Sequence, residues 1–272
     1  MINATGNRMM REINRQQNLA QSISAGQISI STGKRIQRAS DDPVAAARIA
    51  TIRQAQADDV VWSSNLSLGG SLAAQADGVL KTISDRMVRA TELVVAGANG
   101  NLSLADRATI AQELTSIADE IDGYAATQSS LGQPLFSSNS SVMRLDASTT
   151  FAPVPSRTDV FETGGVAISQ IVRDAASAVS AGTASTALSS IQTVTGHIAD
   201  NAADIGVRAA RMDRMREALS ARGIEYASER SGLEDTDLAQ AIATLNAQTL
   251  TLDAAQAAFA RINRRTLMDI LG

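Results

Sequence analysis

An apolar residue at every seventh position near each end of the chain is the feature that most constrains the fold. In the C-terminal segment the apolar residues of this seam are Leu238, Ile242, Leu245, Leu252 and Phe259. In the N-terminal segment the frame is formed by Ile2, Met9, Ile23 and Ile30, and Gln16 interrupts it. Because an apolar seam of this period has to be covered by another helix, we predict that the two terminal segments are long helices that pair with each other.

The composition favours long helices packed through small side chains. Apolar residues make up 44% of the chain but aromatic residues only 3%, and there are only four prolines to interrupt helices. We therefore predict a mainly α fold, an elongated rod of long helices in a coiled-coil-like bundle with a small β-hairpin region. In this rod the N- and C-terminal helices are paired at one end.

Charge and hydropathy limit the possible partners. The net charge of −4, from 24 basic and 28 acidic residues, argues against a nucleic-acid-binding protein. No run of eighteen apolar residues predicts a membrane span, and the first residues lack the apolar core of a cleavable signal peptide. The absence of cysteine excludes disulfides and thiolate metal sites, and we expect no cofactor.

Two breaks in the pattern divide the chain into three predicted parts. After the first helix, over 1–30, residues 31–39 form a polar and basic extended linker with Gly33 as a turn-prone residue. Asp41, Asp42 and Pro43 then start a new helix, with Asp42 as a cap and Pro43 in the first turn. The second break is a slip of the apolar frame between Gly232 and Asp237. We predict an assembly helix with its linker over 1–42, a helical bundle over 43–235 with a hairpin near 129–165, and a second assembly helix over 236–272.

The candidate catalytic residues are weak. His197 is the only histidine, and a lone histidine on a helix is usually solvated. Gly33 and Lys34 lack the spacing and the following Ser or Thr of a phosphate-binding loop. A run of arginines between 208 and 222 suits either an acidic partner surface or a solvated helix face with local ion pairs. We therefore predict a protein that is not an enzyme.

Two sequence blocks carry a family resemblance. The segment 31–36, Ser-Thr-Gly-Lys-Arg-Ile, followed by 40–47, Ser-Asp-Asp-Pro-Val-Ala-Ala-Ala, resembles the N-terminal region of bacterial flagellins and of the hook–filament junction proteins (hook-associated protein 3). Segments 89–100 and 233–239 are similar to the end of the family's long helix and to the entry to its C-terminal helix. Pro43-Val44 and the tail over 266–271 resemble the junction proteins more than the flagellins.

The resemblance implies a structural subunit of the bacterial flagellum that joins hook to filament. Such a protein is exported without a cleavable signal peptide by the flagellar type III apparatus, with an export chaperone, and is extracellular. Its implied partners are further copies of itself, hook-associated protein 1 and flagellin, with no nucleic acid and no membrane insertion. The alternatives are flagellin itself, the main filament subunit, and a cytosolic helical adaptor or enzyme. We predict an assembly interface formed by Ile2, Met9, Ile13, Ile23, Ile30, Leu238, Ile242, Leu245, Leu252, Phe259 and Ile262.

Overall fold

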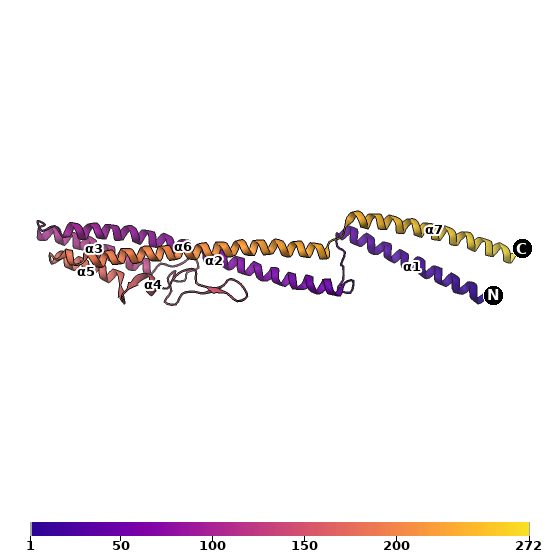
Figure 1. Cartoon of the computed structure of the whole chain (residues 1–272), viewed down its shortest axis with the longest axis horizontal. Coiled ribbons are helices and arrows are strands. Elements are labelled where there is room, and N and C mark those ends of the chain that lie inside the picture. Colours follow the sequence, from indigo (N-terminus) through magenta and orange to yellow (C-terminus); the bar gives the residue numbers. More distant parts are fainter. Residues whose placement is uncertain (1, 272) are drawn as a thin grey trace. The chain divides into compact units, whose positions relative to one another are not determined.

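A computed structural model describes the backbone of residues 2–271 and the side chains of residues 9–261. Long helices dominate it, as predicted, and the strands form only two-residue pairs (Figure 1). The helices are α1 (Ile2–Thr32), α2 (Pro43–Gly97), α3 (Leu104–Ala125), α4 (Arg157–Phe161), α5 (Ile168–Ser180), the 3-10 helix η1 (Ala184–Thr186), α6 (Leu188–Glu234) and α7 (Leu238–Leu271). The strands are β1 (Met143–Arg144), β2 (Thr150–Phe151), β3 (Glu162–Thr163) and β4 (Val166–Ala167).

The chain forms two compact units. The terminal unit comprises Met1–Gln56 and Gly223–Gly272, and the bundle unit comprises Ala57–Arg222. The helices α2 and α6 each contribute residues to both units. The predicted three-part division, with boundaries after residues 42 and 235, stays a prediction about how the chain is used in assembly.

The bundle unit contains the large apolar core. A stripe of residues three and four apart along α2 is buried throughout, and Leu80, Ile83 and Met87 have no exposed surface. Helices α3, α5 and α6 turn their own stripes toward it. Their fully buried residues include Leu114, Val172, Val179, Ile191 and Ile198. At about 1.5–3 kcal/mol for each fully buried aliphatic side chain, this core is the main source of stability in the unit.

Two glycines of α2 allow close contacts within the bundle unit. A Cβ at Gly69 would lie 2.9 Å from the sulfur of Met212 and 3.0 Å from that of Met143. A Cβ at Gly97 would lie 2.8 Å from a methyl group of Val179. Gly69 and Gly97 therefore serve close packing of α2 within the unit.

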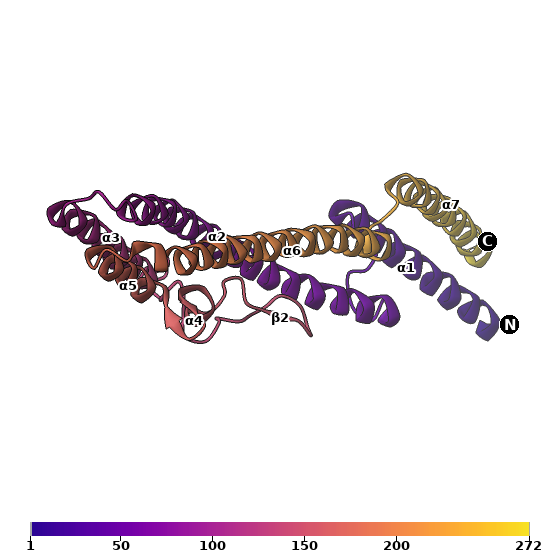
Figure 2. The same ribbon diagram turned by 60° about the vertical axis from the view of Figure 1, so that its left-hand side comes forward.

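The segment between α3 and α5 folds into two small hairpins against the helices (Figure 2). Strand β1 pairs antiparallel with β2, and β3 pairs antiparallel with β4. The rings of Phe136 and Phe161 meet edge to face with centroids 5.1 Å apart and anchor the segment in the core. The predicted hairpin region is thus present, and β4 extends it slightly beyond residue 165.

Residues of α6 that the sequence singled out hold this segment in place. Arg208 donates from Nη1 to the carbonyl of Ala152 at 2.7 Å and pairs with Asp204 at 2.6 Å, and the guanidinium of Arg211 lies 4.9 Å from the centroid of the Phe151 ring. Much of the arginine run is therefore engaged within the unit. His197 is half-buried, with Nε2 lying 3.2 Å from the carbonyl oxygen of Val160, so it contacts the hairpin segment.

Candidate functional site

The paired terminal helices are the candidate assembly site. Helices α1 and α7, which we call the terminal pair, run antiparallel and side by side, so that both chain ends lie at the same end of the pair (Figure 1). A Cβ at Gly26 would lie 3.6 Å from Cδ1 of Leu245, an ordinary packing contact that fixes the register. The half-buried residues that line the seam include Ile13, Gln16, Leu19, Ile23, Ile30, Ala241, Leu245, Gln248, Leu252, Ala255 and Phe259.

This seam is thinly covered. Among the residues of α1 and α7 whose side chains are described, none is fully buried, whereas the bundle unit buries dozens. Gln16 adds a penalty, because its Nε2 is buried and donates to no acceptor in the described structure. An unsatisfied buried amide costs about 1–3 kcal/mol. The terminal pair is therefore weak when only one helix covers each seam.

Several predicted interface residues lie outside the seam. Leu238 and Ile242 are 49% and 47% exposed, and Met9 is 40% exposed. The heptad frame selects residues within a wide sector, but a single partner helix covers only part of that sector, centred on Leu245 and Leu252. Ile2 and Ile262 lie outside the residues whose side chains are described.

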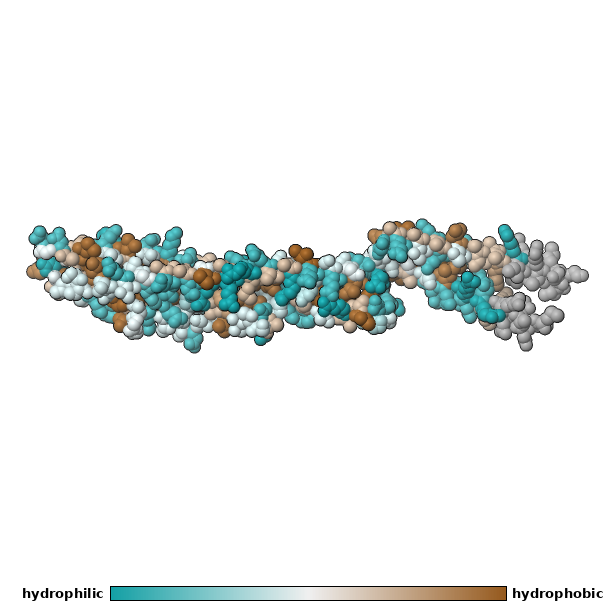
Figure 3. Space-filling model, viewed as in Figure 1, coloured by the Kyte–Doolittle hydropathy of each residue, from teal (hydrophilic) through white to brown (hydrophobic). Residues whose placement is uncertain are grey.

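The terminal pair also presents apolar side chains to the outside. Leu250 on α7 is 71% exposed, and Met10 and Ile28 on α1 are 63% and 49% exposed. Figure 3 shows hydrophobic residues on the visible face of the first part of α7. The sequence frame did not select Leu250, which lies on the side of α7 opposite to the seam. Leu238 and Ile242 lie between this side and the seam, and we call these three exposed side chains together the outer α7 surface.

Two connector segments, residues 33–42 and 235–237, join the terminal pair to the helices α2 and α6. They are linked by an antiparallel bridge between Lys34 and Asp235. The Arg35 N–H donates to the carbonyl of Glu234 at 2.7 Å, and the Thr236 N–H donates to the carbonyl of Gly33 at 2.8 Å. The chain thus enters and leaves the terminal pair through one hydrogen-bonded crossing.

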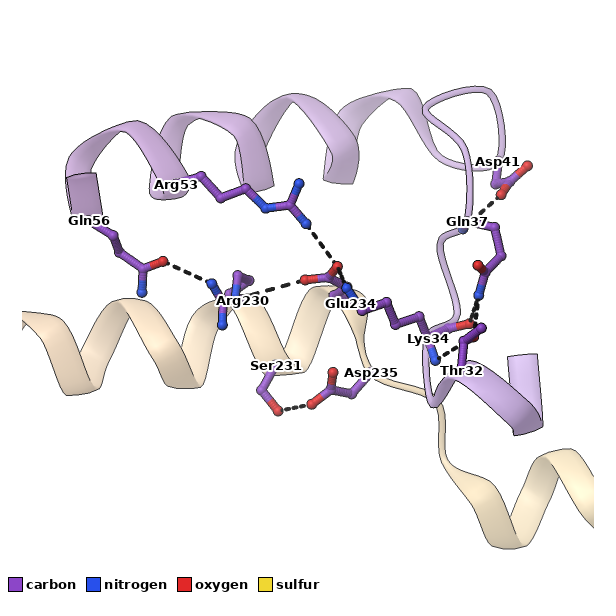
Figure 4. A network of polar contacts seen from close by, with 10 residues as sticks. All are labelled: Thr32, Lys34, Gln37, Asp41, Arg53, Gln56, Arg230, Ser231, Glu234 and Asp235. Atoms are coloured by element: carbon purple, nitrogen blue, oxygen red, sulfur yellow. Dashed lines mark hydrogen bonds and ion pairs between the residues drawn. The ribbon is translucent and has the colours of Figure 1, made fainter. Parts of the chain in front are cut away.

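A buried carboxylate lies at this crossing (Figure 4). Glu234 is only 7% exposed, and its Oε1 lies 2.6 Å from Lys34 Nζ and 2.9 Å from Arg53 Nη2. Arg230 approaches Oε2 at 3.8 Å. The hydrogen bond from Lys34 lowers the pKa of Glu234 below its ordinary value, against the opposing effect of burial. We call these four residues the Glu234 cluster, and they connect the linker, α2 and α6.

The longer connector is shaped by local hydrogen bonds. Gly33, with φ of 69°, ends α1 in the left-handed conformation that glycine adopts without strain. Asp41 Oδ2 accepts from the backbone N–H groups of Arg38 and Gln37, which lower the pKa of its carboxyl group. Asp42 Oδ1 accepts from the Ala45 N–H at 3.0 Å, and Pro43 is the first residue of α2. The geometry at all four predicted linker and cap residues is that of a defined turn.

The sequence did not single out the Glu234 cluster. Lys34 was considered only as part of a phosphate-binding motif and of the family resemblance, and Glu234 only as part of that resemblance. The sequence did contain a signal for this ion pair. Lys34 and Glu234 have opposite charges and lie at the two predicted breaks, and pairing of the terminal helices brings the two breaks together. Arg53 and Arg230 gave no such signal, because they are ordinary charged residues in helical sequence.

Comparisons with known proteins agree with this architecture. Residues 2–141 match the bacterial flagellin N-terminal helical region. The flagellar hook-associated protein 3 of Salmonella typhimurium is 32% identical over 107 residues, which are 39% of this chain and 34% of that protein. The flagellin of Bacillus subtilis is 26% identical over 274 residues, covering 87% of this chain and 88% of that protein.

A solved structure is also similar. The crystal structure of the flagellar hook associated protein-3 from Legionella pneumophila has a TM-score of 0.62 at 14% identity, covering 68% of this chain and 98% of that one. At this identity the likeness concerns the fold. The sequence match to the curated hook-associated protein from Salmonella spans about a third of that protein's length.

The match covers half of the chain, and the chain therefore belongs to the family of the bacterial flagellin N-terminal helical region. This is a non-enzymatic family of flagellar structural proteins, which confirms the predicted resemblance and the prediction that the chain is not an enzyme. Within the described residues, no helix has the length and apolar character that crossing a membrane requires.

Proposed function

We propose that this protein is a structural subunit that joins the flagellar hook to the filament and that assembles through its terminal pair. The observation that carries the proposal is the thin coverage of α1 and α7 together with the exposed outer α7 surface. The chain orders two helices of about thirty residues each without burying any described side chain of them fully. Neighbouring subunits supply the missing coverage.

The energetics support assembly-dependent stability. Burial of apolar surface contributes about 25 cal/mol per Å². A contact of several hundred Å² with neighbouring copies stabilises the helices enough to offset the entropy that is lost when they become ordered. The contacts within the single chain offset this loss only weakly. In the proposed joint the partners are further copies of this chain, hook-associated protein 1 on one side and flagellin on the other.

The same logic fits the proposed route to the cell exterior. A helical pair that is weak before assembly unfolds readily for export through the flagellar type III apparatus, with a chaperone covering its apolar seam. The chain then regains the pair at the growing structure. In this proposal the protein acts outside the cell, in the flagellum.

Flagellin is the second candidate function. It is favoured by the likeness to the Bacillus subtilis flagellin over most of both chains. The hook-joining role is favoured by the likeness to hook-associated protein 3 in sequence and in fold. Counting copies in sheared flagella by gel and mass spectrometry separates the two, because a joint contains a handful of copies and a filament contains thousands.

Deletion of the gene is expected to give cells with hooks that shed filament protein, and normal filaments in the deletion would refute the joining role.

The assembly surface is tested by Leu250→Asp. Leu250 is exposed in the single chain, so a charge there leaves the monomer folded but enters the contact with neighbours. We expect normal helicity by circular dichroism and strongly reduced incorporation into flagella. Leu131→Asp is the matched control, because Leu131 is 60% exposed in a loop of the bundle unit. Incorporation of the Leu250 variant at the level of the control would exclude the outer α7 surface from assembly.

A further inference from the structure

The turn between α2 and α3 contains an asparagine followed by glycine. Both Asn99 and Gly100 are exposed. The backbone of Asn99 is anchored on either side, since its N–H donates to the carbonyl of Ala96 at 3.1 Å and its carbonyl accepts from the Leu102 N–H at 3.3 Å. Its side-chain Oδ1 accepts from the Asn101 N–H at 3.2 Å. This side-chain turn folds the carboxamide of Asn99 back over the following peptide group.

Gly100 leaves its backbone nitrogen accessible. It has no Cβ, and a Cβ built there would meet no atom within 4 Å. The φ angle of Gly100 is not positive, so the backbone conformation of the turn does not require glycine. In the described structure the Gly100 N–H donates to no protein acceptor. Gly100 is therefore an exposed residue whose nitrogen is not held by a hydrogen bond.

We infer that Asn99 is a site of spontaneous covalent modification, deamidation through a cyclic imide. The deprotonated Gly100 nitrogen attacks Cγ of Asn99, the new N–C bond forms, and the C–N bond to the side-chain amide breaks, releasing ammonia. Water then adds to one of the two imide carbonyl groups and opens the ring. One direction gives aspartate and the other gives isoaspartate, in which the chain runs through the former side chain. The only co-reactant is water.

The products alter this end of the bundle unit. Either one places a new carboxylate just beyond the C-terminal end of α2, where the free carbonyl groups of the helix already carry partial negative charge. Isoaspartate also lengthens the backbone of the turn by one methylene group. Gly97, two residues earlier, packs tightly against Val179 of α5, so the lengthened turn begins next to a contact with little room. The inference does not rest on the proposed flagellar function.

The experiment incubates the purified full chain at mildly alkaline pH and follows peptides by mass spectrometry and isoaspartate by enzymatic methyl labelling. We expect the conversion to concentrate at Asn99. Asn101, in the same turn but followed by Leu102, and Asn139, followed by Ser140, serve as internal controls. Gly100→Ala is expected to abolish the conversion without changing helicity or thermal unfolding, because the turn has room for a methyl group there.

Two results would overturn the inference. One is conversion at Asn99 no faster than at Asn101 in the folded chain. The other is a folded protein that converts at Asn99 only after urea unfolding, which would show that the native turn protects the residue. The double variant Asn99→Asp with Gly100→Ala carries the carboxylate on a normal backbone, because the alanine side chain hinders ring closure. It separates the effect of the carboxylate from that of the lengthened backbone.

Discussion

Replacing Gln16 by leucine tests the weakness of the terminal pair. Gln16 occupies the heptad position shared with Met9, Ile23 and Ile30, and its Nε2 is buried without an acceptor. A polar residue at a seam position lowers the stability of a helical pair and helps to define its register. The substitution Gln16→Leu removes the unsatisfied donor and restores the apolar frame in a side chain of similar size.

The size of the effect follows from the two changes. Removal of an unsatisfied buried polar group returns about 1–3 kcal/mol. A fully buried leucine contributes about 1.5–3 kcal/mol. Position 16 is only half-buried, so the added apolar burial contributes about half of that. Together the two changes give about 2–4 kcal/mol, which raises the ratio of paired to open chains by about 30-fold or more.

The assay is helicity and limited proteolysis of the isolated chain. We expect Gln16→Leu to raise the helix content and to protect α1 from cleavage, while the bundle unit is unchanged. Gln17→Leu is the matched control, because the same substitution one residue later falls on an exposed position. If Gln16→Leu protects α1 no more than Gln17→Leu does, the seam that we describe is not the one that stabilises the pair.

Two further changes test the connector and the bundle. Glu234→Gln is expected to destabilise the crossing of the connector segments by about 1–3 kcal/mol, seen as faster proteolysis within residues 33–42, while the exposed Glu225→Gln leaves it unchanged. Because the pKa of Glu234 is lowered in the folded chain, its contribution is complete at neutral pH and is lost as the pH falls through and below about 4.3. Wild-type proteolysis in this segment should therefore rise there more steeply than that of Glu234→Gln, in which Asp41 is the remaining acid-sensitive group. Gly97→Ala places a methyl group against Val179 and should lower stability by about 1–3 kcal/mol in thermal unfolding. Gly78→Ala, in open space on the same helix, should raise stability by up to about 1 kcal/mol, and equal effects of the two would refute the close contact at Gly97.

The long helices and the core stripe of α2 were predictable because a period of three and four residues persists over many turns. The same holds for the caps, since Asp42, Pro43 and Ser103 have strong positional preferences that act within a few residues. The pairing of α1 with α7 followed from the matched heptad frames. Local pattern and tertiary structure agree in these elements.

Other features depend on contacts between residues far apart in the chain. The heptad frame does not show which part of the apolar sector faces the partner helix. Leu238 was therefore predicted inside the seam, and Leu250 was not selected. The Glu234 cluster needs residues from positions 34, 53, 230 and 234, which only the fold brings together. Arg208 was considered for an acidic partner or solvent, but its donation to the Ala152 carbonyl depends on how the hairpin segment folds.

Assembly-dependent order of the terminal pair can be measured by amide hydrogen exchange on the isolated chain and on assembled flagella. We expect residues 9–32 and 238–261 to exchange rapidly in the dilute monomer and slowly in the assembled state, while the core of the bundle unit is protected in both. Slow exchange of both terminal helices in the dilute monomer, equal to that of the bundle core, would contradict assembly-dependent order.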